Sequence, residues 1–188
     1  GLSGKRVFTE LRLIMEEKNP VAAIVRLNDF KLLKEIHPSI VLDKNFISQL
    51  SSVKEVLSWH DLLFLDEAYQ KWIVFFLVLI NQCDAKRTQE ICCRFELAPE
   101  YVKIFCIERF KANKCGIWLE RNRGVSNSVL YRKLAGFRTE LILYMMATAK
   151  QKTVKKAISH FFTDLRRTSI ALKGKDLIKM QLTPGPIY

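Results

Sequence analysis

Glycine and proline are scarce along this chain, and their scarcity limits the number of tight turns that its fold can contain. The 188 residues include only 7 glycines and 5 prolines. These two residues are the strongest markers of turns and of breaks between short strands. So few of them favour long helices over many short strands. We therefore expect an all-α protein.

Apolar residues recur at helical spacing through most of the chain. In the first segment Val7, Leu11, Ile14 and Met15 form one stripe, with Ser3 before them as a candidate N-cap. Further helices are expected, with short connections, at 19–37, 43–64, 67–82, 84–97, 98–121, 126–136, 138–150 and 152–167. They make about nine helices and no repeat of fixed period.

Helix boundaries follow from capping residues and prolines. Asn19 is a candidate cap with Pro20 in the first turn, Pro38 follows a helix end, and Pro99 opens another helix. Gly136 is a candidate for the left-handed residue that ends the helix starting near Ser126.

The most apolar segment, WIVFFLVLI at 72–80, predicts a buried core helix. Its nine residues are far fewer than the roughly 20 that span a bilayer. No signal peptide is visible, and we expect no membrane partner. Five cysteines without C-x-x-C spacing predict buried free thiols in a reducing cytoplasm, with no zinc site.

Positive charge is concentrated in the last part of the chain. Residues 1–110 carry equal numbers of basic and acidic side chains, whereas residues 111–188 hold the whole excess of +12. This asymmetry indicates a surface that binds a polyanion. The alternative is a solvated basic face that has no partner.

The segment KTVKKAISHFFTDLRR, at 152–167, places most of its cations on one face of a regular helix. On a helical wheel Val154, Ile158, Phe161 and Leu165 share one side. The opposite side carries small hydroxyl residues and five cations, namely Lys152, Lys155, Lys156, Arg166 and Arg167. We expect this face either to lie along phosphates or to remain solvated.

No catalytic motif is recognisable. The chain has no glycine-rich phosphate loop, no G-x-S-x-G and no D-x-D or E-x-E pair that would hold two magnesium ions. His60-Asp61 is the dipeptide of metal-dependent HD phosphohydrolases, but a His-Asp pair on a helix surface explains it better. We expect no catalytic residue and no metal ligand in this chain.

Three segments together resemble the C-terminal half of class II tRNA nucleotidyltransferases, which include CCA-adding enzymes, A-adding enzymes and bacterial poly(A) polymerases. The segment LSGKRVFTELRLIMEEKNPVAAIVRLNDFKLLKEIHP resembles the neck of these enzymes, with Arg6, Glu10 and Leu11 matching and Lys5 replacing a glutamate. VSNSVLYRKLAGF is similar to a turn and helix in the body. LKGKDLIKMQLTPGPIY resembles a helix–turn–helix of the tail, with Gln181 where glycine is usual.

The resemblance implies an all-α neck, body and tail, without the catalytic head. The expected regions are 1–40 (remainder of the neck), 41–120 (body) and 121–188 (basic body and tail, cut at its C-terminal end). Mg²⁺ and ATP or CTP would belong to the head. The expected partners are that head and the acceptor and T arms of tRNA, or another structured RNA.

The residues expected to contact RNA form two groups. The first is Lys152, Lys155, Lys156, Arg166, Arg167, Lys173 and Lys175, and the second is Arg121, Arg123, Arg132 and Lys133. Arg6 and Glu10, one helical turn apart, are expected to brace the neck. Two alternatives remain: a helical scaffold whose basic face docks an acidic partner or another domain, and an HD-type hydrolase. The sequence does not distinguish addition of CCA, A or poly(A).

Overall fold

Two buried helices, α5 (Lys71–Leu79) and α10 (Thr139–Thr148), form the centre of the fold in this computed structural model, which describes residues 3–167. Every residue from Trp72 to Ile80 is buried, as is every residue from Thr139 to Ala147. α10 contacts α4, α5, α8 and α11, and α5 contacts α1 and α4. The core therefore forms around the two segments that were most apolar in the sequence.

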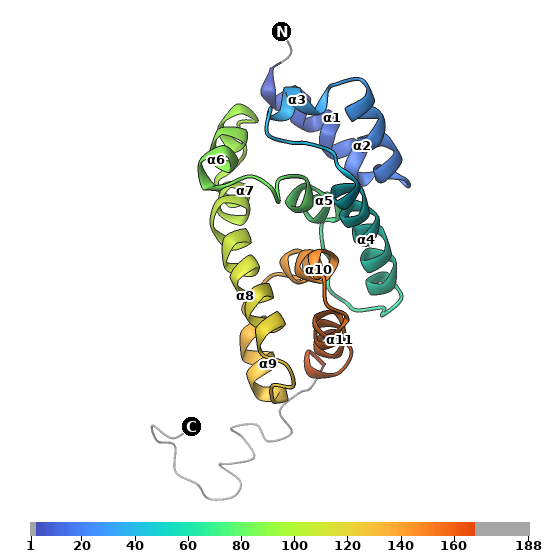
Figure 1. Ribbon diagram of the computed structural model, residues 1–188, viewed down its shortest axis with the longest axis vertical. Helices are drawn as coiled ribbons and strands as arrows, with labels where there is room; N and C mark the ends of the chain where they lie inside the picture. Colours follow the sequence, from blue (N-terminus) through green and yellow to red (C-terminus); the bar gives the residue numbers. More distant parts are fainter. Residues whose placement is uncertain (1–2, 168–188) are drawn as a thin grey trace, which may run out of the picture.

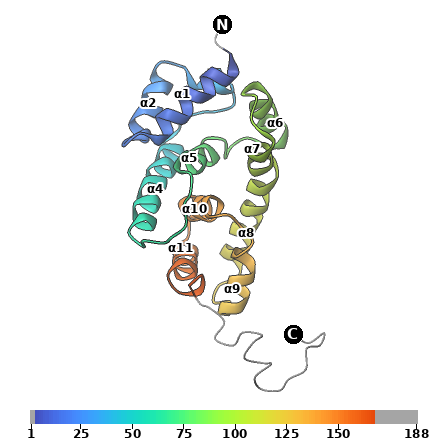
Figure 2. The same cartoon turned by 180° about the vertical axis from the view of Figure 1, so that it is seen from behind.

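The other helices stand in two columns on either side of this centre (Figure 1). One column contains α1 (Gly4–Glu16), α2 (Pro20–Asp29), α3 (Leu33–Ile36) and α4 (Lys44–Asp61). The other contains α6 (Ala85–Arg94), α7 (Pro99–Lys103), α8 (Arg109–Arg121) and α9 (Asn127–Leu134), and α11 (Lys152–His160) lies beneath α10. The view from behind shows the same arrangement (Figure 2).

All regular elements of the described part of the chain are helical, so the expected fold class is confirmed. No described helix is both long enough and apolar enough to cross a bilayer. The predicted caps are partly confirmed: Ser3 accepts a hydrogen bond from the Arg6 backbone nitrogen at 3.4 Å, whereas the Asn19 side chain caps nothing. Pro20 and Pro99 open their helices as expected.

Several expected boundaries were wrong because two charged residues adopt the left-handed conformation. Lys31 has a φ of 59° and Glu96 a φ of 52°. In the residue that follows each of them, the backbone nitrogen donates a hydrogen bond back to the helix, from Leu32 N to Leu27 O and from Leu97 N to Cys92 O. This bond closes each helix with a Schellman-type turn. Lys31 thus divides the helix expected at 19–37, while Gly136 lacks the left-handed φ that we predicted.

Between residues 3 and 167, two π turns interrupt the long helices. Ile104–Glu108 joins α7 to α8, and Phe161–Leu165 continues α11. A π turn contains one residue more than an α turn, so the residues after it are rotated relative to a regular helix. An arginine follows each π turn directly, Arg109 in the first case and Arg166 in the second.

Arg109 is fully buried and links α5, α6 and α8. Its guanidinium donates hydrogen bonds to Ile80 O at 3.1 Å, Cys83 O at 2.9 Å and Thr88 Oγ1 at 2.7 Å. A cation at the C-terminal end of α5 satisfies carbonyls that have no partner within the helix. Burial lowers the pKa of this arginine. Arg109 therefore holds the central helix to the α6–α9 column.

The cysteines follow the prediction in part. All five are free thiols, and Cys83, Cys92 and Cys115 are buried, but Cys106 is half-buried and Cys93 is exposed. Burial, followed by the neighbouring Cys106, raises the pKa of Cys92. Burial also raises the pKa of Cys115, so Cys92 and Cys115 stay protonated and act as small apolar groups in the core.

Candidate nucleic-acid interface

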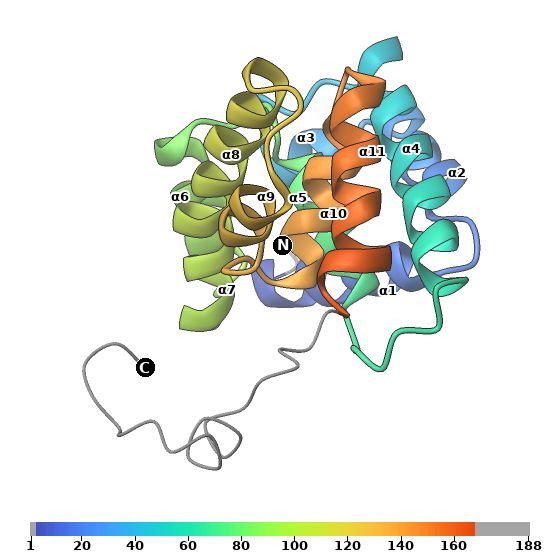
Figure 3. The same ribbon diagram turned by 90° about the horizontal axis from the view of Figure 1, so that it is seen from below.

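The helices that carry the described members of the two predicted groups of cations, α8, α9 and α11, come together at one end of the molecule (Figure 3). α11 contacts α8, and the π turn after α11 contacts α9. The ring of His160 lies 3.1 Å from Asn127 Oδ1, and the rings of Tyr131 and Phe161 are 6.0 Å apart. These contacts place segments distant in sequence on a common surface.

α11 is oriented as the helical wheel predicts. Val154 and Ile158 are buried, whereas Lys152 and Lys156 are exposed. Lys155 is half-buried, and its Nζ donates to Ser52 Oγ of α4 at 3.2 Å. Lys152 and Lys156 thus present two cations to solvent, while Lys155 links α11 to α4.

The second group surrounds the connection between α8 and α9. Its members Arg121, Arg123, Arg132 and Lys133 are all exposed. Arg123 Nη2 donates to Gln151 Oε1, immediately before α11, at 3.1 Å. Lys133 Nζ lies 4.7 Å from the centroid of the Trp118 ring, a cation–π contact that orients it. The hydrogen bond between Arg123 and Gln151 therefore connects the second group of cations to the first group on α11, so that the two form one continuous surface.

Arg166 and Arg167 differ from the other cations because they follow a π turn. The turn rotates Arg166 toward the apolar side, where its guanidinium carbon lies 5.3 Å from the centroid of the Phe162 ring. Arg166 forms an ion pair with Glu67 and donates to Thr139 Oγ1 at 3.1 Å. Arg167 is exposed and donates to Leu63 O at 2.7 Å. Arg166 thus joins elements within the fold, while Arg167 remains at the surface.

Few carboxylates oppose these cations. Residues 121–167 contain 11 Lys and Arg side chains but only two acidic ones, Glu140 and Asp164. Glu140 is buried, 3.3 Å from Arg138 Nε, and accepts a hydrogen bond from Gln70 N. Hydrogen bonds from Thr163 and then His160 lower the pKa of Asp164. The exposed charge of this end is therefore strongly positive.

Several predicted residues lie elsewhere or outside the described part of the chain. Lys173, Lys175 and the ending at 182–188 lie outside residues 3–167. Arg6 and Glu10 are both exposed on α1, and no ion pair joins them to each other within the described residues. Glu10 instead lines a largely apolar groove of about 470 Å³ with Val7, Leu11, Ile14, Leu27, Leu32, Glu35, Ile36 and Arg94.

The His60-Asp61 pair does not lie together on the helix surface as expected. His60 is buried, its ring 4.9 Å from that of Phe162 and 5.1 Å from that of Tyr69, centroid to centroid. Tyr69 Oη donates to Asp61 Oδ1 at 2.7 Å. Within residues 3–167 no three His, Cys, Asp or Glu side chains are grouped to hold a metal ion. The geometry gives no support to an HD-type hydrolase.

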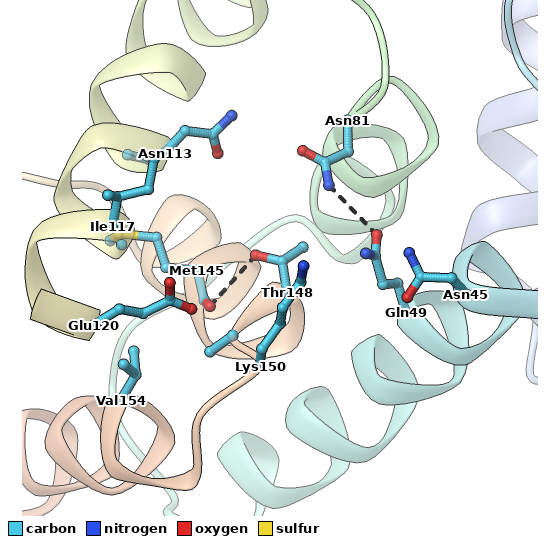
Figure 4. A pocket seen from close by; sticks show the side chains of 13 residues that line it. Asn45, Gln49, Asn81, Asn113, Ile117, Glu120, Met145, Thr148, Lys150 and Val154 are labelled. Atoms are coloured by element: carbon cyan, nitrogen blue, oxygen red, sulfur yellow. Dashed lines mark hydrogen bonds between the residues drawn. The ribbon is translucent and has the colours of Figure 1, made fainter.

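The sequence did not indicate a polar hollow of about 390 Å³ between α4, α8 and α10 (Figure 4). Its wall on α8 consists of Ala112, Asn113, Gly116, Ile117 and Glu120, and side chains from α4, from α10 and from Asn81, which follows α5, face them. Asn113, Gly116, Ile117 and Glu120 follow the spacing i, i+3, i+4, i+7, which indicates that they share one face of α8. A polar face of this kind also occurs on any solvated helix, so spacing alone does not predict the hollow.

Comparison with known proteins gives two sequence relatives. No protein-family model matches the chain. An A-adding tRNA nucleotidyltransferase of Geobacter sulfurreducens is 33% identical over 194 residues, which is 100% of this chain and 22% of the relative. A second, from Aquifex aeolicus, is 22% identical over 96% of this chain and 21% of its own length. The chain therefore spans about one fifth of the length of the curated relatives it matches.

Solved structures share the fold. A CCA-adding enzyme in complex with ATP superposes with a TM-score of 0.74 at 20% identity, covering 99% of this chain and 44% of that one. A tRNA-processing enzyme in an apo form gives a TM-score of 0.75 at 21% identity, over 95% of this chain and 46% of the other. The all-α architecture is thus one already known from tRNA-processing enzymes.

Proposed function

We propose that this chain, which is homologous over its whole length to one part of the class II tRNA nucleotidyltransferases, is a non-catalytic RNA-binding region of such an enzyme. It would hold the backbone of tRNA, at the acceptor and T arms, while another part of the enzyme adds nucleotides to the 3′ end. The cytoplasm, where thiols stay reduced, suits its five free cysteines.

The observation that carries this proposal is the continuous group of exposed cations at the α8–α9–α11 end. We assign phosphate contacts to Lys152, Lys156, Arg167, Arg121, Arg123, Arg132 and Lys133, all of which are exposed. We also propose phosphate contacts for Lys173 and Lys175, on the basis of the sequence alone. Arg166 and Lys155 are assigned supporting roles because Glu67 and Ser52 already engage them.

Such a surface would recognise shape more than sequence. The deep, narrow major groove of an A-form helix does not admit side chains that read base edges, so proteins contact its phosphates and 2′-hydroxyls. Lysine and arginine on short, separate helices can follow a curved backbone at several points. Affinity would then depend on salt, because each neutralised phosphate releases counterions.

The other functions of the enzyme would belong to the rest of the polypeptide. We infer that a catalytic head supplies the carboxylates, Mg²⁺ and ATP or CTP, and that the groove beside α1 is a surface against which it packs. Leu32 lines this groove and is 48% exposed. A longer form of the enzyme should protect Leu32 from solvent. Equal labelling of Leu32 with and without the head would contradict this contact.

Charge reversal tests the RNA-binding surface. The double variant Lys152→Glu/Lys156→Glu should weaken tRNA binding at least about tenfold, because each phosphate contact contributes to affinity regardless of sequence. The matched control Lys34→Glu/Lys86→Glu reverses two exposed cations at the opposite end of the molecule. Filter binding or fluorescence anisotropy measures both. Equal affinities of the two variants would contradict the proposal.

The scaffold alternative predicts a different competition pattern. A basic face that docks an acidic protein or domain would be blocked equally by heparin, single-stranded RNA and folded tRNA. The RNA-binding proposal predicts that folded tRNA competes best at equal phosphate concentration. Indifference to RNA structure would favour the scaffold.

A further inference from the structure

The hollow between α4, α8 and α10 combines hydrogen-bonding groups with an apolar wall. Asn45 and Gln49 come from α4, Asn81 follows α5, and Asn113 and Glu120 come from α8 (Figure 4). Ile117, Met145 and Val154 supply apolar surface, and Lys150 stands at the edge. A volume of about 390 Å³ lies within the range of small-molecule sites. The hollow therefore has the size and the mixed lining of a ligand site.

A buried tyrosine fixes which atoms two of the amides present. Tyr144 Oη lies 2.6 Å from Asn81 Oδ1 and 2.7 Å from Asn113 Oδ1. A phenol has one hydrogen to donate, so one of these amides must turn its NH₂ toward the phenol oxygen. Asn81 Nδ2 already donates to Gln49 Oε1 at 3.4 Å. We therefore infer that Asn113 is the residue that turns its NH₂ toward the Tyr144 oxygen. Its carbonyl oxygen is then free to face the hollow.

The α8 wall then presents acceptors. The Asn113 carbonyl and the Glu120 carboxylate lie two helical turns apart on one face, with Gly116 and Ile117 between them. Glu120 is half-buried and has no hydrogen bond or ion pair with another described residue. An acceptor pair of this kind favours a flat ligand that carries N–H donors. The Ile117 side chain, 49% exposed, offers such a ligand an apolar surface.

We propose that this hollow binds an amino-bearing nucleobase, that is, adenine, cytosine or guanine, taken from the RNA that the cationic surface holds. Glutamate accepts hydrogen bonds from exocyclic amino groups, and asparagine and glutamine match base edges with paired donor and acceptor atoms. Uracil lacks an amino group and is disfavoured. This inference rests on the proposed function for the source of the base.

The position of the hollow supports RNA bound at the cationic surface as the source of the base. Lys150, Ala149 and Val154 contribute to its wall and lie on either side of Lys152, a member of the cationic surface. A nucleotide splayed from a backbone bound at Lys152 would thus be close to the opening. Unstacked bases inserted into protein pockets are a common mode of RNA recognition.

Gly116 offers a clean way to block the hollow. A Cβ added there meets no atom within 4 Å, so a larger side chain would enter the open space without a clash. Gly116→Leu also raises helix propensity within α8. Ala22→Leu is the matched control, since it adds a leucine to an exposed helical position of α2 at the other end of the molecule.

The first measurement uses free mononucleotides as probes. In ¹H–¹⁵N NMR spectra of the chain, AMP, CMP and GMP should shift the side-chain amide signals of Asn45, Gln49, Asn81 and Asn113, and UMP should shift them much less. Gly116→Leu should abolish these shifts, and Ala22→Leu should preserve them. No response, an equal response to UMP, or the same response in Gly116→Leu would overturn the proposal.

The second measurement uses tRNA and separates this inference from the proposed function. Gly116→Leu should lower tRNA affinity about tenfold, since a well-paired base contributes about 1–3 kcal/mol. If Lys152→Glu/Lys156→Glu weakens binding but Gly116→Leu leaves it unchanged, the base site is overturned and the RNA-binding surface stands. If neither variant weakens binding, both proposals fail.

Discussion

Individual side chains in this protein often have roles that their residue type alone does not reveal. Arg109 and Arg166 are both arginines in helical segments, yet one is fully buried and the other is ion-paired with Glu67. His60, which we expected on a helix surface beside Asp61, is packed among aromatic rings with neither ring nitrogen hydrogen-bonded in the described part of the chain. Arg109, Arg166 and His60 each lead to a testable prediction.

Arg109 should be essential for stability. Replacing it with methionine keeps most of its volume but leaves the buried carbonyls of Ile80 and Cys83 without their donor. Loss of such a buried, charge-assisted network costs about 3–5 kcal/mol. Urea denaturation followed by circular dichroism measures the change. A loss below about 1 kcal/mol would show that water or neighbouring donors replace the guanidinium.

His60 should make the protein less stable in mild acid. Burial lowers its pKa below the usual 6.5, and the charge of Arg166 adds to the effect against the opposing carboxylates Asp61 and Glu67. Below pH 6.5 the unfolded chain therefore binds a proton that the folded chain does not, so this contribution to stability falls as pH drops. The variant His60→Phe should show a shallower decrease in unfolding free energy from pH 7 to pH 5. Parallel pH profiles would contradict this assignment.

At the scale of the elements, helix ends and π turns explain most of the differences between expectation and structure. Helical stripes and prolines predicted the location of most helices, because apolar spacing reflects which face is buried. They did not predict the left-handed lysine and glutamate that end α2 and α6, since that position usually holds glycine. A wheel with constant rotation also placed Arg166 beside Lys155 on the cationic face, because sequence spacing does not reveal a π turn.

The residues that follow α6 and α9 lead to two related predictions. Glu96→Gly should stabilise the protein by about 0.5–1 kcal/mol, because glycine adopts the left-handed conformation without steric cost. Gly136→Ala should also stabilise by about 0.4–1 kcal/mol, since Gly136 has no left-handed φ and a Cβ there meets open space. Thermal unfolding measures both. Destabilisation by Gly136→Ala would imply that this glycine does end α9 in a left-handed conformation.

The π turn after α11 separates structural from RNA-binding cations. Arg166→Met should destabilise the fold by about 1–3 kcal/mol, because it removes the cation that pairs with Glu67 and the donor to Thr139 Oγ1, yet change tRNA affinity less than about twofold. Lys156→Glu should do the reverse. Unfolding curves and anisotropy titrations on the same samples give both values. Strong loss of tRNA binding by a folded Arg166→Met variant would return Arg166 to the phosphate-contacting group.

At the scale of the whole molecule, the fold collects charges that are scattered along the sequence. Arg121 and Arg123 are about 30 residues from Lys152 and Lys156, and the packing of α8 against α11 places them at the same end. The charge asymmetry predicted that such a surface exists, because net charge does not depend on the details of packing. The hollow beside it required the structure, since its residues come from α4, α8, α10, α11 and the end of α5, whose proximity only the tertiary fold determines.

The central claim is that this surface binds RNA through its phosphates, and the salt dependence of tRNA affinity tests it most directly. A plot of log K against log salt concentration should be linear with a negative slope, and each exposed cation in contact should contribute roughly 0.7–0.9 to its magnitude. Lys152→Glu/Lys156→Glu should reduce that slope by about 2, and Lys34→Glu/Lys86→Glu should leave it unchanged. A flat plot, or no binding of tRNA at low salt, would contradict the account.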